Sequence, residues 1–275
     1  MCIITISKGS YTRGEQVARM VAARLGYRCM GREVILEASK EFDIPEIRLV
    51  RAISDAPSVL DRFTHGKERY IAYFSATLLK QFRRDNVVYH GLAGHFFVKD
   101  VSHALRVRIL ADIEDRIKIV MKRDKTSREE ALRTLQTDDE ARRNWSRSLY
   151  GIDTADPGLY DIVIDMERLT IDEAADIICH AAGLGGFQAT RESQKAIDDL
   201  ALAAETRAAL VGIRPDAEVR TDDGFVSVHI KLPLIPFGEE RHLVEEMKRV
   251  AESVRGVRQV DIKVSHTWVV GPEFS

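Results

Sequence analysis

The stretch from Ile3 to Met20 limits the possible folds of this chain more than any other. An apolar, β-branched run stops at Lys8-Gly9, and after a short polar loop the apolar residues recur at helical spacing until Gly26. The pattern predicts a strand, a loop and a helix. Backbone N–H groups of such a loop point where the positive end of the helix dipole also points, which favours a bound phosphate group.

The two glycines that bound this loop, Gly9 and Gly14, have the spacing of a P-loop. The full motif continues with Lys and then Ser or Thr, whereas this chain has Glu15 and Gln16. The cation that reaches the β- and γ-phosphates and the hydroxyl that holds Mg²⁺ are therefore missing from their usual positions. Lys8 or Arg13 could supply the charge from within the loop. A structural turn that leads into a packed helix is the alternative interpretation.

Strand and helix patterns alternate through the first 183 residues. Short strands are expected at 87–89, 105–110 and 160–165, and helices at 67–84, 112–121 and 170–182. Such alternation pairs strands in parallel through crossover connections, and ligands then gather at the carboxyl ends of the strands. We expect the first loop, Arg32 and His90 to meet at this edge.

A charged helical segment lies between the last two of these strands. It begins with a capping box at Ser127 and carries several arginines with little apolar content on one side. One guanidinium group can donate two parallel hydrogen bonds to the oxygens of a phosphate. The candidates for contacting phosphates are therefore Arg133, Arg142, Arg143 and Arg147. A solvated helix whose charges pair at i,i+4 is the alternative.

A second pattern follows a hinge-like stretch at 183–187. It consists of a helix (194–211), two strands (216–221 and 225–232), a second helix (239–254) and a last strand (257–265). We therefore expect a first domain at 1–183, a linker at 184–192 and a small α+β domain of order α-β-β-α-β at 193–268.

Composition excludes some classes of function. The formal charge of −2 over 275 residues gives no global basic field, so a nucleic-acid partner is not expected. The three cysteines have neither a metal-ligand spacing nor a disulfide framework, which fits a reducing compartment. No apolar run is long enough to span a bilayer, and the first strand leaves no room for a signal peptide. We expect a cytoplasmic protein without a membrane span and without a protein-built metal site.

The order of these features resembles the cytidylate kinase-like family of P-loop nucleoside monophosphate (NMP) kinases. The resemblance covers residues 1–183 and rests on the Gly9-x4-Gly14 loop, the pair Arg32-Glu33, the sequence Asp115-Arg116-Ile117, the arginine-rich arm and the final strand from Tyr160. It implies an α/β fold in which a P-loop kinase-type parallel sheet is flanked by helices and carries a helical NMP-binding insertion and a lid.

The resemblance also implies roles for individual residues. Donor phosphates would be held by the first loop, which consists of Gly9, Ser10, Tyr11, Thr12, Arg13, Gly14, Glu15 and Gln16. The acceptor would be held by Arg32 and His90. The lid would include Arg123, Arg133, Asp138, Asp139 and Arg147, with Lys8, Arg142 and Arg143 as the catalytic cations. The implied substrates are ATP, with Mg²⁺, and CMP or another NMP.

Two positions depart from the family's pattern. Gly31 stands where an Asp commonly precedes the Arg-Glu pair, and His90 stands where the Gly-rich loop usually offers an Arg. Together with Glu15 these departures support a second hypothesis, a regulatory protein that binds nucleotide without transferring phosphate. Its C-terminal unit resembles a BON domain, a class of binding module, so an unknown ligand or protein would be its partner.

Overall fold

All five strands of the larger sheet run parallel. A computed structural model describes residues 2–9, 13–31, 33–42, 66–233 and 237–267. The sheet consists of β1 (Ile3–Lys8), β2 (Arg28–Met30), β3 (Val87–His90), β4 (Ala104–Leu110) and β5 (Ile162–Asp165), in the order β2-β3-β1-β4-β5. The parallel α/β architecture expected from the alternating pattern is thereby confirmed.

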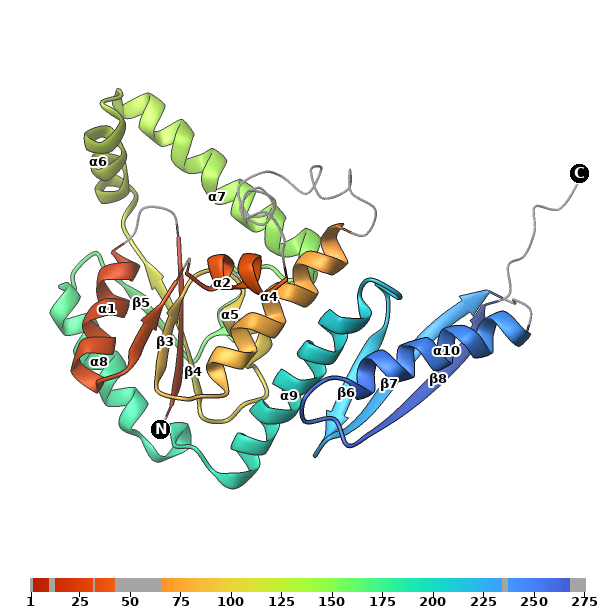
Figure 1. The fold of residues 1–275 in the computed structure, drawn as a ribbon. Coiled ribbons are helices and arrows are strands. Elements are labelled where there is room, and N and C mark those ends of the chain that lie inside the picture. Colours follow the sequence, from red (N-terminus) through yellow and green to blue (C-terminus); the bar gives the residue numbers. More distant parts are fainter. Residues whose placement is uncertain (1, 10–12, 32, 43–65, 234–236, 268–275) are drawn as a thin grey trace, which may run out of the picture.

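Helices cover both faces of this sheet (Figure 1). On one face, α1 (Gly14–Leu25) and α8 (Ile171–Gly183) pack against alternate residues of β1, including Ile4 and Ile6. On the other face, α2 (Glu33–Glu41), α4 (Gly66–Phe82) and the short α5 (Gly94–Phe97) pack around Ile3 and β3. Because both faces are covered, the first four residues of β1 are buried, and three of these four are isoleucines. The sequence pattern did not predict α5, which is only 4 residues long.

Helices α6 (Ile113–Asp124) and α7 (Arg128–Tyr150) project beyond the carboxyl edge of the sheet (Figure 1). They share a small apolar cluster of Ile117, Val120, Ala131 and Leu135. The capping box at Ser127 is present, and its hydroxyl accepts a hydrogen bond from the backbone N–H of Glu130. The far end of α7 is anchored, because Trp145 is buried in the main core. A 3-10 turn, η2 (Pro157–Leu159), then leads to β5.

The C-terminal part has the expected order α-β-β-α-β. After the turn η3 (Gly185–Phe187) come α9 (Arg191–Leu210), β6 (Glu218–Asp222), β7 (Phe225–Pro233), α10 (Phe237–Glu252) and β8 (Gln259–Thr267). The smaller sheet has the order β6-β7-β8, with β6 antiparallel and β8 parallel to β7. Helix α9 starts at Arg191, three residues before the expected Gln194, because Thr190 caps it.

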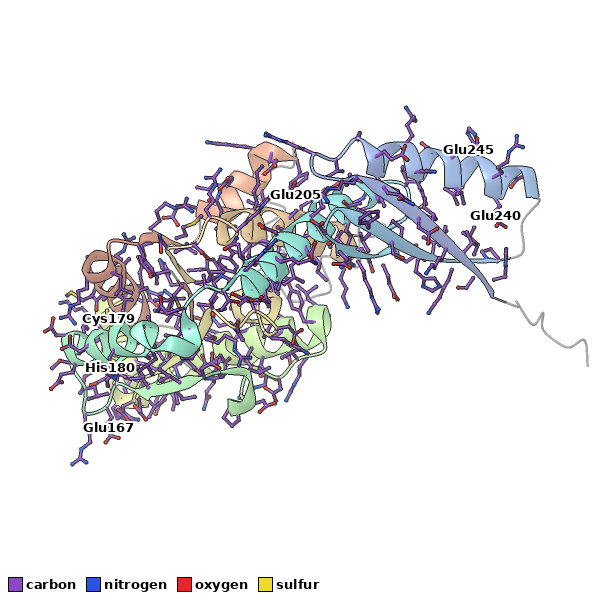
Figure 2. The ribbon with its side chains drawn as sticks, turned by 90° about the horizontal axis from the view of Figure 1, so that it is seen from below. Glu167, Cys179, His180, Glu205, Glu240 and Glu245 are labelled. Carbon is purple, nitrogen blue, oxygen red and sulfur yellow. The ribbon has the colours of Figure 1, made fainter. Side chains whose placement is uncertain are left out.

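Helix α9 contacts both parts of the chain. Figure 2 shows it between the larger body and the smaller sheet. Ile197, Ala201, Ala204 and Ala208 belong to the same core cluster as α4, whereas Leu210 belongs to the cluster of the smaller sheet. The expected domain limits at 183 and 193 remain a prediction, and the structure adds that the helix following them is packed against α4.

None of the helices in the described ranges combines the length and apolar content that crossing a bilayer would need.

Candidate functional site

The carboxyl edge of the larger sheet holds a cavity of about 140 Å³. Its walls are the end of β1 with Gly9, the end of β4, and the facing sides of α6 and α7. Three of the cations named from the sequence, Lys8, Arg142 and Arg143, line it together. This edge is where ligands of parallel α/β sheets bind, and the end of β1 with Lys8 and Gly9 lies at it.

Arg142 contacts the end of the first strand directly. Its Nη1 donates a hydrogen bond to the backbone carbonyl of Lys8, with a distance of 3.4 Å between nitrogen and oxygen. Burial lowers the pKa of Lys8, and the charge of Arg142 adds to this effect while Glu15 opposes it. Two cations thus lie at one point of the cavity wall, and an anion there would relieve their mutual repulsion.

Glu15 is held mainly by Arg19, one helical turn further on. Its Oε1 accepts hydrogen bonds from Nε and Nη2 of Arg19 at 3.2 and 3.0 Å, and its Oε2 lies 3.6 Å from Nζ of Lys8. The hydrogen bond with Arg19 lowers the pKa of Glu15, and the charge of Lys8 acts in the same direction. The carboxylate is therefore ionised, half-exposed and shared between two cations.

Helix α1 begins at Gly14, directly after Arg13, the last residue of the loop. Its N-cap is Arg13, whose guanidinium has no acceptor atom and so cannot cap the N–H groups of this turn. Gly14 is buried at the start of α1, whereas Arg13 and Gln16 are exposed. Ser10, Tyr11 and Thr12 lie outside the described residues.

The lid residues named from the sequence divide into two groups. Asp139 lines the cavity, and both its oxygens accept hydrogen bonds from Nη2 of Arg116 at 2.7 Å. Three arginines form ion pairs with residues near in the chain and do not line this cavity: Arg123 with Asp124, Arg133 with Glu129 and Arg147 with Asp153. Asp138 is half-buried on α7. Of the lid and catalytic residues named from this segment, Asp139, Arg142 and Arg143 therefore line the cavity.

The two departures noted from the family's pattern lie against each other. His90 ends β3, and a Cβ atom added to Gly31 would lie 2.5 Å from Cε1 and 2.8 Å from Nε2 of its imidazole. Glycine at position 31 thus leaves the space that the His90 ring fills. Burial lowers the pKa of His90, as does the charge of Lys8, so the ring is neutral at neutral pH. Arg32, the other expected acceptor contact, lies outside the described residues.

A further cation on the cavity wall, Arg108, was not predicted from the sequence. Arg108 of β4 lines the cavity, and its Nη1 donates to the hydroxyl of Tyr160 at 3.2 Å, which in turn donates to the carbonyl of Thr154 at 3.0 Å. The buried ring of His95 packs on Tyr160 with 4.9 Å between centroids. Alternating arginines in β4 could have revealed this, because an inner parallel strand is normally apolar throughout.

Sequence comparisons relate the first part of the chain to known proteins. A sequence profile described as the cytidylate kinase-like family matches residues 3–168. A cytidylate kinase of Methanosarcina acetivorans is 34% identical over 96 residues, which are 34% of this chain but only 52% of that relative. A cytidylate kinase of Ignicoccus hospitalis is 25% identical over 169 residues, 60% of this chain and 90% of the relative.

One solved structure has a similar fold. The crystal structure of an uncharacterized protein from Eubacterium ventriosum superimposes with a TM-score of 0.52 at 20% identity, covering 66% of this chain and 97% of that one. At this identity the likeness concerns the fold alone.

Proposed function

This chain belongs to the cytidylate kinase-like family, and we propose that it transfers a phosphoryl group from ATP to a nucleoside monophosphate, with CMP as the expected acceptor. The observation that carries the proposal is the meeting of Lys8, Arg142 and Arg143 in one cavity, with Nζ of Lys8 3.6 Å from Oε2 of Glu15 in the first turn of α1. Phosphoryl transfer depends chiefly on positioning and on neutralising the charge of the phosphates. Cations at a helix N-terminus supply both.

Each residue has a role in this proposal. The loop from Gly9 to Gln16 would hold the donor phosphates, with the dipole of α1 adding to the attraction. Arg142 and Arg143 would neutralise charge as α6 and α7 close over the site. Arg32 and His90 would contact the acceptor.

Mg²⁺ would arrive as part of the ATP complex. Among the described residues no cluster of three or more His, Cys, Asp or Glu side chains is arranged to hold a metal ion. Asp139, the acidic side chain on the cavity wall, already accepts two hydrogen bonds from Arg116. The cationic wall instead fits a polyphosphate, whose own oxygens are ligands that Mg²⁺ prefers.

A nucleotide-binding regulator is the second candidate. The ion pair of Glu15 with Lys8 and the packing of His90 on Gly31 favour it, because both change positions on which the transfer chemistry would rely. In that case nucleotide occupancy would be relayed to the C-terminal unit (193–268), for which a BON-like binding role is proposed. A cytoplasmic location fits either candidate.

Titration calorimetry with ATP and CMP, followed by a coupled assay of ADP release, distinguishes the two. The kinase is supported by binding and turnover, and the regulator by binding without turnover. Failure to bind either nucleotide contradicts both.

Replacing Arg142 and Arg143 with Ala should lower turnover by about 10²-fold or more, because cations that stabilise a transition state have effects of this size. Arg133→Ala is the matched control, since this lid arginine is exposed and pairs only weakly with Glu129 at 3.5 Å. A double variant that loses stability in proportion to its turnover would show that the two arginines are structural.

A further inference from the structure

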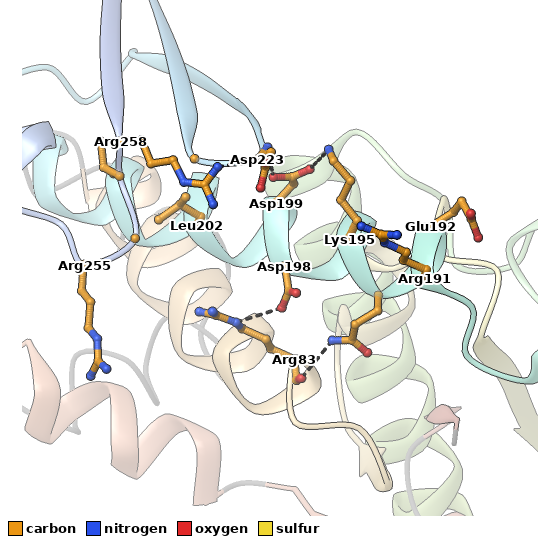
Figure 3. Close-up of a pocket in the computed structure, with 14 residues that line it drawn as sticks. Arg83, Arg191, Glu192, Lys195, Asp198, Asp199, Leu202, Asp223, Arg255 and Arg258 are labelled. Atoms are coloured by element: carbon orange, nitrogen blue, oxygen red, sulfur yellow. Dashed lines mark hydrogen bonds and ion pairs between the residues drawn. The ribbon is translucent and has the colours of Figure 1, made fainter.

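A second and larger cavity lies where the C-terminal part meets the larger body (Figure 3). Its volume is about 820 Å³, and its walls are the residue after α4 (Arg83), the first half of α9, the β6–β7 turn and the segment 255–258 before β8. Arg83 precedes β3, so this junction cavity lies toward the amino ends of the strands. The candidate nucleotide site lies at their carboxyl ends, and the two cavities share no residue.

Most residues that line the junction cavity carry a charge. Only Leu202 and Val257 contribute large apolar side chains, whereas five cations and four carboxylates line the space. The cations are Arg83, Arg191, Lys195, Arg255 and Arg258, and the carboxylates are Glu192, Asp198, Asp199 and Asp223. A charged ligand would therefore meet several side chains of opposite charge on this wall.

The three aspartates on this wall each hold a cation already. Arg83 donates to Asp198 at 2.9 Å, Arg258 donates to Asp223 at 2.9 Å, and Lys195 lies 2.6 Å from Asp199. Lys195 also contacts Asp222, just outside the cavity. The acidic side of the wall is therefore largely neutralised from within.

Two arginines on the wall have no such partner. Arg191 at the start of α9 and Arg255 before β8 form no ion pair with any residue of the described ranges. Figure 3 shows Arg258 pointing to Asp223, while Arg255 points away from that pair. Arg83 and Arg258 also keep further N–H donors, because a guanidinium has five. The cavity thus has unused guanidinium donors, and its lining holds one more cation than carboxylates.

The backbone holds the two turns of this wall close together. Gly224 and Gly256 have φ values of +83° and +103°, which favour glycine. A Cβ at Gly224 would lie 2.9 Å from Cγ of Arg258, whose backbone N–H donates to the carbonyl of Gly224 at 2.8 Å. The backbone that carries Arg255 and Arg258 is therefore held in place beside the β6–β7 turn, whereas the side chains of Arg191 and Arg255 are exposed and accessible to a ligand.

We propose that the junction cavity binds a small soluble phosphate compound through Arg191 and Arg255, with the free donors of Arg83 as a third contact. One guanidinium group can donate two parallel hydrogen bonds to phosphate oxygens. A tetrahedral phosphate has further oxygens that can accept hydrogen bonds from arginines on other elements. The volume falls within the range of about 300–1,000 Å³ found for small-molecule sites, so a nucleotide fits as well as a simple phosphate. The proposal does not depend on the kinase activity.

Inorganic pyrophosphate is a suitable probe, since it carries the phosphate groups and nothing else. Titration calorimetry is done on the full-length chain carrying Arg142→Ala and Arg143→Ala, which weakens binding at the other site. We expect this chain still to bind pyrophosphate, and the affinity to fall at least tenfold when Arg191→Ala and Arg255→Ala are added. ADP in place of pyrophosphate tells whether a nucleoside adds to the affinity.

The matched control is Arg220→Ala, an exposed arginine of β6 outside the cavity, which should leave the affinity unchanged. A charge-conserving variant, Arg191→Lys with Arg255→Lys, guards against loss of folding and should bind more weakly than the parent, because lysine lacks the guanidinium fork. The proposal is overturned if the chain carrying only Arg142→Ala and Arg143→Ala does not bind pyrophosphate. It is also overturned if Arg220→Ala weakens binding as much as the substitutions of Arg191 and Arg255.

Discussion

The contact between Gly31 and His90 shows how two unusual residues can depend on each other. Each departs from the family's pattern at a different place in the sequence, 59 positions apart by their numbers. In the structure the absent side chain of one makes room for the ring of the other. No local pattern in the sequence could have linked them, because periodicity describes neighbours along one element only.

A side chain at position 31 should therefore disturb His90. Gly31→Ala is expected to cost about 1–3 kcal/mol of unfolding free energy, the usual range for overpacking. Combined with His90→Ala the cost should be smaller than the sum of the two single changes, because the clash is gone. Urea unfolding of the four chains measures this coupling, and strict additivity would contradict the contact.

The buried His95 predicts a dependence of stability on pH. Burial lowers its pKa from 6.5 to about 3, with the charge of Arg108 acting in the same direction. Below pH 6.5 the unfolded chain therefore binds a proton that the folded chain does not. The stabilising contribution is complete above pH 6.5 and is lost as the pH falls toward 3, by about 1.4 kcal/mol per pH unit for one proton.

His95→Phe removes this proton. On going from pH 7.5 to 5.0, the parent chain should lose about 2 kcal/mol of unfolding free energy relative to the variant. His180→Asn, at an exposed position of α8, should keep the parent's dependence. Equal slopes for the parent and His95→Phe would mean that the ring is protonated in the folded protein.

At the scale of elements, local patterns predicted most of the fold and little of the site's internal geometry. The strand ending at Lys8, the capping box at Ser127 and the alternation along β7 all depend on residues close in the chain. The hydrogen bond from Arg142 to Lys8 joins residues 134 positions apart. This hydrogen bond depends on the position of α7 over the end of the sheet. The burial of Trp145 in the main core anchors α7 there, and this packing joins residues that are distant in the sequence.

The α6–α7 pair should depend on the ion pair of Arg116 with Asp139. Arg116 is only 11% exposed, so a change of Asp139 weakens an ion pair to a mostly buried guanidinium. Asp139→Asn is expected to lower the unfolding free energy by about 1–2 kcal/mol. Glu129→Gln breaks the exposed pair with Arg133 on the same helix and should change it by at most about 0.5 kcal/mol. Urea unfolding compares the two, and equal effects would contradict a special role for Asp139.

At the scale of the whole molecule, α9 makes the two parts depend on each other. Its side chains fill the core beside α4 as well as the cluster of the smaller sheet. The sequence predicted a boundary ahead of this helix from the glycines at 183–186. Glycine-rich composition indicates a flexible connection, but it does not indicate against which element the following amphipathic helix will pack.

A buried residue of α9 tests this dependence. Ile197 is fully buried in the core cluster that contains Trp145. With Trp268→Phe as background, fluorescence reports Trp145 alone, and Ile197→Ala should lower its unfolding free energy by about 2–4 kcal/mol. Ile177→Ala, at a position of α8 that is 41% exposed, is the control. An unchanged Trp145 transition would mean that α9 unfolds independently of the larger body.

Helix α4 reaches from one cavity region to the other. At its start, Nζ of Lys67 donates to the carbonyl of Ser148 near the end of α7, and just past its end Arg83 is held by Asp198 of α9. Its 17 residues extend about 25 Å. The α-helix fixes the separation of these two contacts along its axis. Helix α4 thus ties the end of α7 to the wall of the junction cavity through a single rigid rod.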